Sequence, residues 1–132
     1  MSQRIGSIAF LVRDYDEAIA FFVQQLRFDL LQDQPLGTEG KRWVRVAPSG
    51  GKGTALLLAR ATTPGQQEQV GQQGGGRVFL FLQTDDFQRD YEGMKMRGVK
   101  FLEEPRAEPY GRVVVFADLY GNKWDLVEMA PD

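Results

Sequence analysis

The sequence contains neither cysteine nor histidine. Without cysteine the chain has no disulfide, no thiol nucleophile and no thiolate metal ligand. Without histidine it lacks the usual general base near neutral pH and the commonest ligand of transition metals. A Ser-His-Asp or Cys-His catalytic device is therefore impossible within one chain. Any metal site would need oxygen ligands, which suit Mg²⁺, Ca²⁺ or Mn²⁺ better than Zn²⁺.

The sequence also lacks a strong charge of one sign and a long apolar run. Its 132 residues include 16 Lys and Arg against 18 Asp and Glu, a net charge of −2, which gives no electrostatic case for nucleic-acid binding. No apolar run approaches the roughly 18 residues of a membrane helix, and no signal-peptide pattern is visible. We therefore expect no nucleic-acid partner, no membrane partner and a cytoplasmic protein. The apolar content of 42% is ordinary for a globular chain.

An internal repeat organises the chain. The order strand–helix–strand–strand–strand occurs twice, and each half is too small to stand alone comfortably. The expected division is a first module over residues 1–61, a loop over 62–76 and a second module over 77–132, which together make one domain. The first strand, residues 5–12, has little polar alternation and is expected to be buried on both faces. Asp14 is expected to be the N-cap of a helix over residues 16–26. The remaining expected elements are strands 28–32, 42–47, 54–61 and 78–83, helix 87–97, and strands 99–102, 112–117 and 123–127.

Two polar stretches separate these elements. Residues 62–76 are rich in Gln and Gly and have almost nothing to bury, so we expect a mobile loop that serves as a linker or a lid. The acid pair Glu103 and Glu104, next to Pro105, is expected to be a solvated turn.

Asp125 is the most unusual residue of the last strand. It lies between Trp124 and Leu126, and an acid in an apolar strand is costly unless it is paired, ligates a metal or faces a wet cavity. Residues 118–122, directly before that strand, are Asp, Leu, Tyr, Gly and Asn, a composition that predicts a tight turn.

Three motifs resemble the vicinal oxygen chelate superfamily, which includes glyoxalase I, extradiol dioxygenases, and fosfomycin- and bleomycin-resistance proteins. They are the two strand-to-helix junctions, VRDYDEAIAFF and TDDFQRDYEGMKMRGVKF, and the terminal DLYGNKWDLVE. The resemblance implies an α+β fold in which two βαβββ repeats form a half-open mixed β-sheet cleft, and chains that pair as homodimers. The sequence departs from the family pattern at Arg27 (usually Gly), Leu119 (usually Pro) and Asp125 (usually Glu).

In metal-dependent members of that superfamily four ligands line the cleft. The resemblance places them at Ser7, about Leu57, Phe79 and Asp125. One carboxylate and one hydroxyl would hold a divalent ion weakly, and the Phe79 ring would occupy the metal's place. We therefore expect no metal and no other cofactor.

Strand alternation extends this cleft, because side chains two residues apart on a strand point to the same face. Matching the repeats adds Trp43 and Arg45, alternation adds Phe81, and the resemblance adds Val115. A mostly apolar cleft with a few polar groups is typical of small-molecule sites. The residues expected to contact a ligand are Ser7, Trp43, Arg45, Leu57, Phe79, Phe81, Val115 and Asp125.

Plainer structural interpretations stay open for these residues. Asp125 could form a salt bridge with Arg45 or Lys123. Arg45 could be a solvated charge on an edge strand, and Trp43 and Phe81 could belong to the core.

Three functions are consistent with the sequence. The leading hypothesis is a metal-independent, bleomycin-resistance-like protein that binds a small, partly aromatic or amphipathic molecule within the chain and at a homodimer interface. Arg45 would meet an anionic or carbonyl group, and Trp43 and Phe81 would stack on the ligand. The second is a glyoxalase- or dioxygenase-like enzyme (lyase, isomerase or oxidoreductase) that uses Asp125 as a base or a sparse metal ligand. The third is an interaction or regulatory module, which predicts a filled cleft with no pocket.

Overall fold

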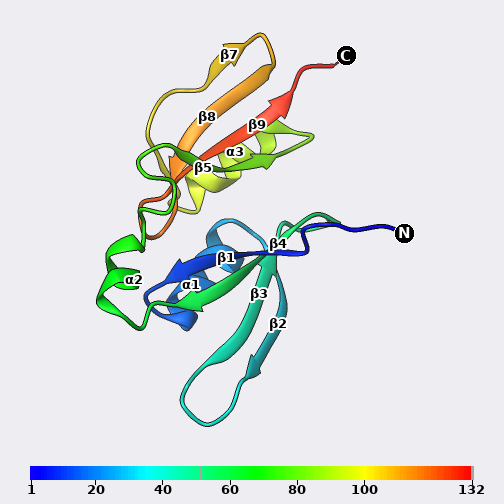
Figure 1. The fold of residues 1–132 in the computed structure, drawn as a ribbon. Helices are drawn as coiled ribbons and strands as arrows, with labels where there is room; N and C mark the ends of the chain where they lie inside the picture. The colour runs from blue at the N-terminus through cyan, green and yellow to red at the C-terminus, as the bar shows by residue number, and fades with distance from the viewer. Residues whose placement is uncertain (51, 132) are drawn as a thin grey trace. The chain divides into compact units, whose positions relative to one another are not determined.

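The computed structural model describes residues 1–50 and 52–131. The chain separates into two compact units, Met1–Val70 and Gly71–Asp132, and each contains a mixed β-sheet and at least one helix (Figure 1). The predicted α+β class and the repeated strand–helix–strand order are therefore confirmed. Within the described residues, no helix is long and apolar enough to span a membrane.

The first unit contains a four-stranded sheet of order β1-β4-β3-β2 (Figure 1). β1 runs parallel to β4, whereas β3 is antiparallel to both β4 and β2. Its elements are β1 Ser7–Val12, α1 Tyr15–Ala20, the π-helical turn η1 Phe21–Gln25, β2 Asp29–Pro35, β3 Arg42–Ala47, β4 Ala55–Arg60 and α2 Pro64–Gln69.

Alternate strand residues of this sheet form the core with α1 and η1. Phe10, Val44 and Val46 are fully buried, and the Phe10 ring meets the Phe22 ring edge to face at 5.4 Å. The prediction that the first strand is buried on both faces is wrong, because Ala9 on the opposite face is exposed. Asp14 is the predicted N-cap, since its carboxylate accepts the backbone N–H of Glu17 at 2.9 Å.

The stretch 62–76 is more ordered than its composition predicted. Thr63 caps a short helix, α2, by accepting the backbone N–H of Gln66 at 3.1 Å, and Pro64 occupies the first turn, where it suits a helix. The Gln66 side chain in turn accepts the backbone N–H of Thr62 at 2.8 Å. The expectation of a loop is therefore wrong for residues 64–69, which form α2, whereas the mobility of the stretch and its role as linker or lid stay predictions.

The second unit contains a sheet of order β5-β9-β8-β6 (Figure 1). β7 pairs with the first residues of β8, and β6 pairs with its last residues. β5 and β9 are parallel, as β1 and β4 are in the first unit. The sequence did not predict β7, because Pro105 and Pro109 flank it and favour turns. The elements are β5 Val78–Gln83, α3 Phe87–Met96, β6 Lys100–Phe101, β7 Arg106–Glu108, β8 Gly111–Ala117 and β9 Lys123–Met129.

The predicted turn at residues 118–122 is confirmed, and a buried carboxylate holds it together. Asp118 accepts the backbone N–H groups of Tyr120 and Asn122 at 3.0 and 3.1 Å, and the indole N–H of Trp124 at 2.8 Å. Burial raises the pKa of Asp118, whereas these donors lower it. Gly121 has φ of 96°, which a residue without Cβ adopts at no steric cost. The turn thereby fixes where β9 begins, and with it the position of Asp125.

Arg27 occupies a backbone conformation that normally belongs to glycine. Its φ is 62°, and it is the one non-glycine residue in the described part of the chain with a positive φ. It joins η1 to β2, where the backbone N–H of Phe28 reaches the Phe22 carbonyl at 2.8 Å. A left-handed conformation costs a residue with Cβ about 1–2 kcal/mol, part of which glycine gives back as extra entropy of the unfolded chain.

Arg27→Gly is therefore expected to raise the free energy of unfolding by about 0.5–1 kcal/mol. The measurement is urea unfolding followed by circular dichroism. Gln24→Gly is the matched control, because the same change in the regular helical backbone of η1 is expected to cost about 1 kcal/mol. Equal losses of stability in both variants would show that Arg27 carries no strain.

Candidate functional site

A hydrogen-bonded network crosses one face of the first unit's sheet. The Arg45 guanidinium donates from Nε to the Ser7 hydroxyl at 3.0 Å and from Nη1 to the Gln32 carbonyl at 3.0 Å. The same Gln32 oxygen accepts the Trp43 indole N–H at 2.9 Å. Three strands, β1, β2 and β3, are thus joined by side chains on the face opposite α1. We call this surface the Trp43 face.

The Trp43 face presents an exposed aromatic ring, Trp43, and a guanidinium group, Arg45, that hydrogen bonds hold in place. Trp43 is 37% exposed, so its interpretation as core is wrong for this chain. Arg45 is half-buried on β3, which has β2 on one side and β4 on the other. It is therefore not a solvated charge on an edge strand. Leu57 lies directly across from Arg45 in the β3–β4 register, so the face alternates apolar and polar groups.

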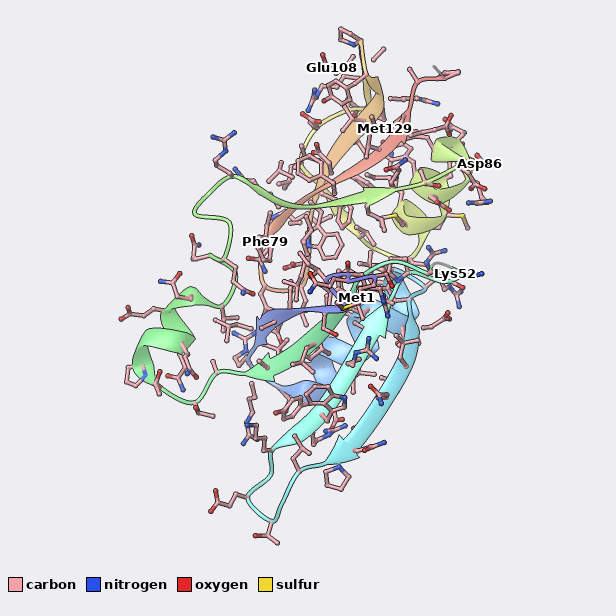
Figure 2. All side chains as sticks on the ribbon, turned by 45° about the vertical axis from the view of Figure 1, so that its right-hand side comes forward. Met1, Lys52, Phe79, Asp86, Glu108 and Met129 are labelled. Carbon is pink, nitrogen blue, oxygen red and sulfur yellow. The ribbon has the colours of Figure 1, made fainter. Side chains whose placement is uncertain are left out.

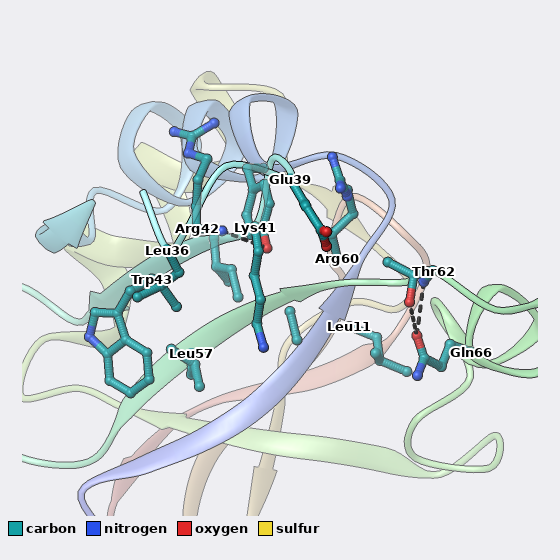
Figure 3. A pocket seen from close by; sticks show the side chains of 13 residues that line it. Leu11, Leu36, Glu39, Lys41, Arg42, Trp43, Leu57, Arg60, Thr62 and Gln66 are labelled. Atoms are coloured by element: carbon teal, nitrogen blue, oxygen red, sulfur yellow. Dashed lines mark hydrogen bonds between the residues drawn. The ribbon is translucent and has the colours of Figure 1, made fainter. Parts of the chain in front are cut away.

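A pocket of about 490 Å³ opens at one end of this face (Figure 3). The β3–β4 ladder stops at the pair Val44 and Leu58, although both strands continue in pairing with their outer neighbours. Trp43 and Leu57 line the pocket on one side, and Leu11 and Gln66 line it on the other. The pocket does not fit the expectation of a module without one.

The predicted residues of the second unit gather around Asp125. Phe81 and Val115 are its direct neighbours in register on β5 and β8. Phe81 is 67% exposed, so it is not a core residue here. Phe79 lies at the start of β5 (Figure 2) in an irregular part of the β5–β9 register, with its Cβ close to Gly74. The resemblance assigned Phe79 to the Asp125 face, and alternation from Phe79 added Phe81; this irregularity breaks the alternation between the two residues.

Asp125 itself is buried, and one of its carboxylate oxygens is unpaired. It is 5% exposed, and its Oδ1 has no hydrogen-bond partner. Burial raises the pKa of its carboxyl; nearby Glu103 also raises this pKa, whereas Arg106 lowers it. Within the described residues Asp125 forms no salt bridge with Lys123, whose ammonium instead donates to the Gly76 carbonyl at 3.2 Å. An acid with a raised pKa and a free oxygen can accept a hydrogen bond or a proton.

Two functional candidates were missed by reasoning from sequence. Glu103 is not a solvated turn residue: its Oε2 accepts the backbone N–H of Val115 at 3.1 Å and pairs with Arg106 at 3.0 Å. Gln32 connects Trp43 and Arg45, but a register shift in β2 directly before it hides which face it occupies. Neither position carried a compositional signal that could have revealed its role.

The residues at the four positions implied by the resemblance do not fit a metal. Ser7 accepts a hydrogen bond from a guanidinium, which places a cation next to a supposed ligand. Leu57 and Phe79 have no donor atom, and Asp125 is a single carboxylate. Across residues 1–50 and 52–131, no group of three or more acidic side chains is placed to hold an ion. Divalent ions bound by proteins require more oxygen ligands than this.

Several known proteins are similar to this chain in sequence or in structure. An uncharacterized protein of Shewanella frigidimarina is 54% identical over 98% of this chain and 96% of its own length. The crystal structure of TnmS3, an antibiotic-binding protein from a Streptomyces species, is 32% identical with a TM-score of 0.78 and covers 98% of each chain. A glyoxalase/bleomycin resistance protein from the same Streptomyces strain is 34% identical with a TM-score of 0.70, over 92% of this chain and 97% of its own.

The family relationship follows from a match over most of the sequence. The model of the Glyoxalase/Bleomycin resistance protein/Dioxygenase superfamily matches residues 4–126. This range includes the Trp43 face and extends into β9 as far as Leu126, the residue after Asp125. The chain therefore belongs to the glyoxalase/bleomycin resistance protein/dioxygenase superfamily.

Proposed function

We propose that this protein binds a small, partly aromatic or amphipathic molecule without metal and without changing it chemically. The observation that carries the proposal is the hydrogen-bonded network of Trp43, Gln32, Arg45 and Ser7. This network holds an exposed ring and a cation in fixed positions beside a pocket. Side chains that are held in place before binding lose less conformational entropy on binding, which favours affinity.

The chemistry of the Trp43 face suits a ligand with a flat apolar body and one polar group. The Trp43 ring supplies a stacking surface. Arg45 has N–H groups that match a carbonyl, carboxylate or phosphate oxygen. Leu57 supplies apolar contact between them. TnmS3, which is 32% identical to this chain, is an antibiotic-binding protein, and this supports a small-molecule ligand for this chain.

Homodimer formation in the cytoplasm belongs to the same proposal. Phe81 and Trp43 remain 67% and 37% exposed in the single chain, and large exposed apolar groups favour burial in an interface or under a ligand. A second copy of the chain would therefore contribute walls to the binding cleft. Sedimentation of the purified protein measures its oligomeric state.

Removal of the Trp43 ring or the Arg45 cation is expected to weaken ligand binding. A thermal-shift screen with aromatic antibiotics, bleomycin and daunorubicin among them, selects the ligand, and calorimetry measures its Kd. We expect Trp43→Ala and Arg45→Met each to raise this Kd about tenfold, because each removes a contact worth about 1.4 kcal/mol.

Matched controls on other surfaces separate binding from general surface effects. Met96→Ala removes an 89% exposed apolar side chain from α3, and Arg13→Met removes an exposed arginine that pairs with Glu17 at 3.5 Å. Both controls are expected to bind like the wild type. Ligand affinities unchanged in all four variants would contradict a site on the Trp43 face.

A second candidate function, catalysis at Asp125, is favoured by the free buried Oδ1 atom. Stoichiometric Mn, Fe, Ni or Zn in protein purified without chelator would support this enzyme and overturn the metal-independent proposal. The expected result is no stoichiometric metal.

Asp125→Asn is expected to stabilise the folded chain at neutral pH by about 1 kcal/mol, because it removes a buried charge whose Oδ1 has no hydrogen-bond partner. Since burial raises the folded pKa of Asp125, the wild type loses stability as pH rises through that pKa, and Asn does not titrate. The gain should therefore shrink at acidic pH. Urea unfolding at neutral and at acidic pH measures this gain in the free energy of unfolding. Destabilisation of Asp125→Asn at neutral pH would contradict the prediction and show that the carboxylate makes favourable interactions.

A further inference from the structure

The pocket on the Trp43 face lies where β3 and β4 separate. Leu36 donates its backbone N–H to the Lys41 carbonyl, so strand alternation directs the backbone N–H of the next residue, Arg42, toward β4. No β4 carbonyl meets it, because the ladder has ended at Val44 and Leu58. The Tyr15 hydroxyl accepts this N–H instead, at 3.2 Å.

Side chains from α1 and β2 hold this opening in place. Tyr15 is 5% exposed, and the Arg42 guanidinium lies 5.1 Å from the centre of its ring. Arg42 also pairs with Asp33 at 2.7 Å and Asp16 at 2.9 Å, and these bonds raise the pKa of Arg42 above its ordinary value. The strand ends are therefore fixed apart by a connected set of bonds, and Arg42 is fully compensated by its two acids.

The remaining charges of the pocket leave a cationic excess. Lys41, Arg60 and Glu39 line it. Within the described residues neither Lys41 nor Arg60 has an ion-pair partner, and the Arg60 guanidinium lies 5.6 Å from the centre of the Tyr15 ring. Figure 3 shows the Lys41 side chain reaching over the sheet between Trp43 and Leu11. Two cations against one acid, beside an exposed indole, are complementary to an aromatic anion.

We infer that the pocket takes an aromatic molecule with an acidic group, the ring against Trp43 and Leu57 and the acid toward Lys41, with Arg60 adding to the attraction. This inference rests on the proposed binding function and narrows its ligand class to aromatic carboxylates, sulfonates and phosphates. Lys41 acts as the residue that determines specificity, whereas Trp43 provides affinity for any flat apolar ring.

Two fluorescent probes test the inference, because they differ by a single sulfonate group. Anilinonaphthalene sulfonate (ANS) carries a sulfonate, and N-phenylnaphthylamine (NPN) is the same ring system without it. We expect the wild type to bind one ANS per chain about fivefold more tightly than NPN, as one partly exposed ion pair allows. Lys41→Met should lose this preference while its Kd for NPN is unchanged, and Lys41→Arg should retain it. Lys100→Met, an exposed lysine of β6, is the matched control and should retain it too.

The outcomes distinguish a failure of this inference from a failure of the proposed binding function on which it rests. Equal affinity for the two probes in the wild type, or an undiminished preference in Lys41→Met, overturns the anionic ligand class. If Trp43→Ala then still weakens both probes, the binding function stands and only the inference fails. If neither probe binds saturably, the binding function of this face fails as well.

Discussion

The Gln32 carbonyl is the acceptor on which the candidate site depends. It takes one hydrogen bond from the Trp43 indole and one from the Arg45 guanidinium, so a single oxygen fixes the orientation of a ring and of a cation. Arg45 then reaches Ser7 on β1, which ties the far edge of the sheet to the same network. Loss of this oxygen would remove both hydrogen bonds, so that neither the Trp43 ring nor the Arg45 guanidinium would be held by β2.

The two repeats have used the same fold in different ways. In the first unit, polar groups on the sheet face are satisfied by one another, and the open end of the β3–β4 ladder provides space. In the second unit, the corresponding sheet face holds Asp125, whose Oδ1 remains free, with the ion pair of Glu103 and Arg106 nearby. Neither set of residues supplies the oxygen ligands that a divalent ion needs. The chain thus keeps the architecture of its superfamily while its ligand positions carry a hydroxyl, two apolar groups and one acid.

The elements with strong local signals could be predicted from the sequence. β3 and β5 were predicted at their observed bounds, since both are runs of β-branched and aromatic residues between turn signals. The Asp118 turn and the Asp14 cap were also predicted, because the chemistry of each lies within a few residues. The faces of the strands were predictable wherever the ladder is regular.

The other features of the site could not be predicted from the sequence, because they depend on local irregularities and on tertiary contacts. The register shifts before Gln32 and at Phe79 change which side chains share a face of the sheet. No residue type at these positions predicts such a shift. Glu103 looked like a turn residue because its partners, Arg106 and the Val115 N–H, are supplied by tertiary structure. The pocket itself arises where a ladder ends early, which depends on the Tyr15 hydroxyl rather than on any motif.

The indole N–H signals of Trp43 and Trp124 in a nitrogen–proton NMR spectrum test the central claim most directly. Trp43 lies exposed on the proposed binding face, whereas Trp124 is 3% exposed and bonded to Asp118, so each titration carries its own control. The compound that gives the largest thermal shift should move the Trp43 signal saturably and leave the Trp124 signal in place. A bound compound that leaves the Trp43 signal unmoved would contradict ligand binding on the Trp43 face.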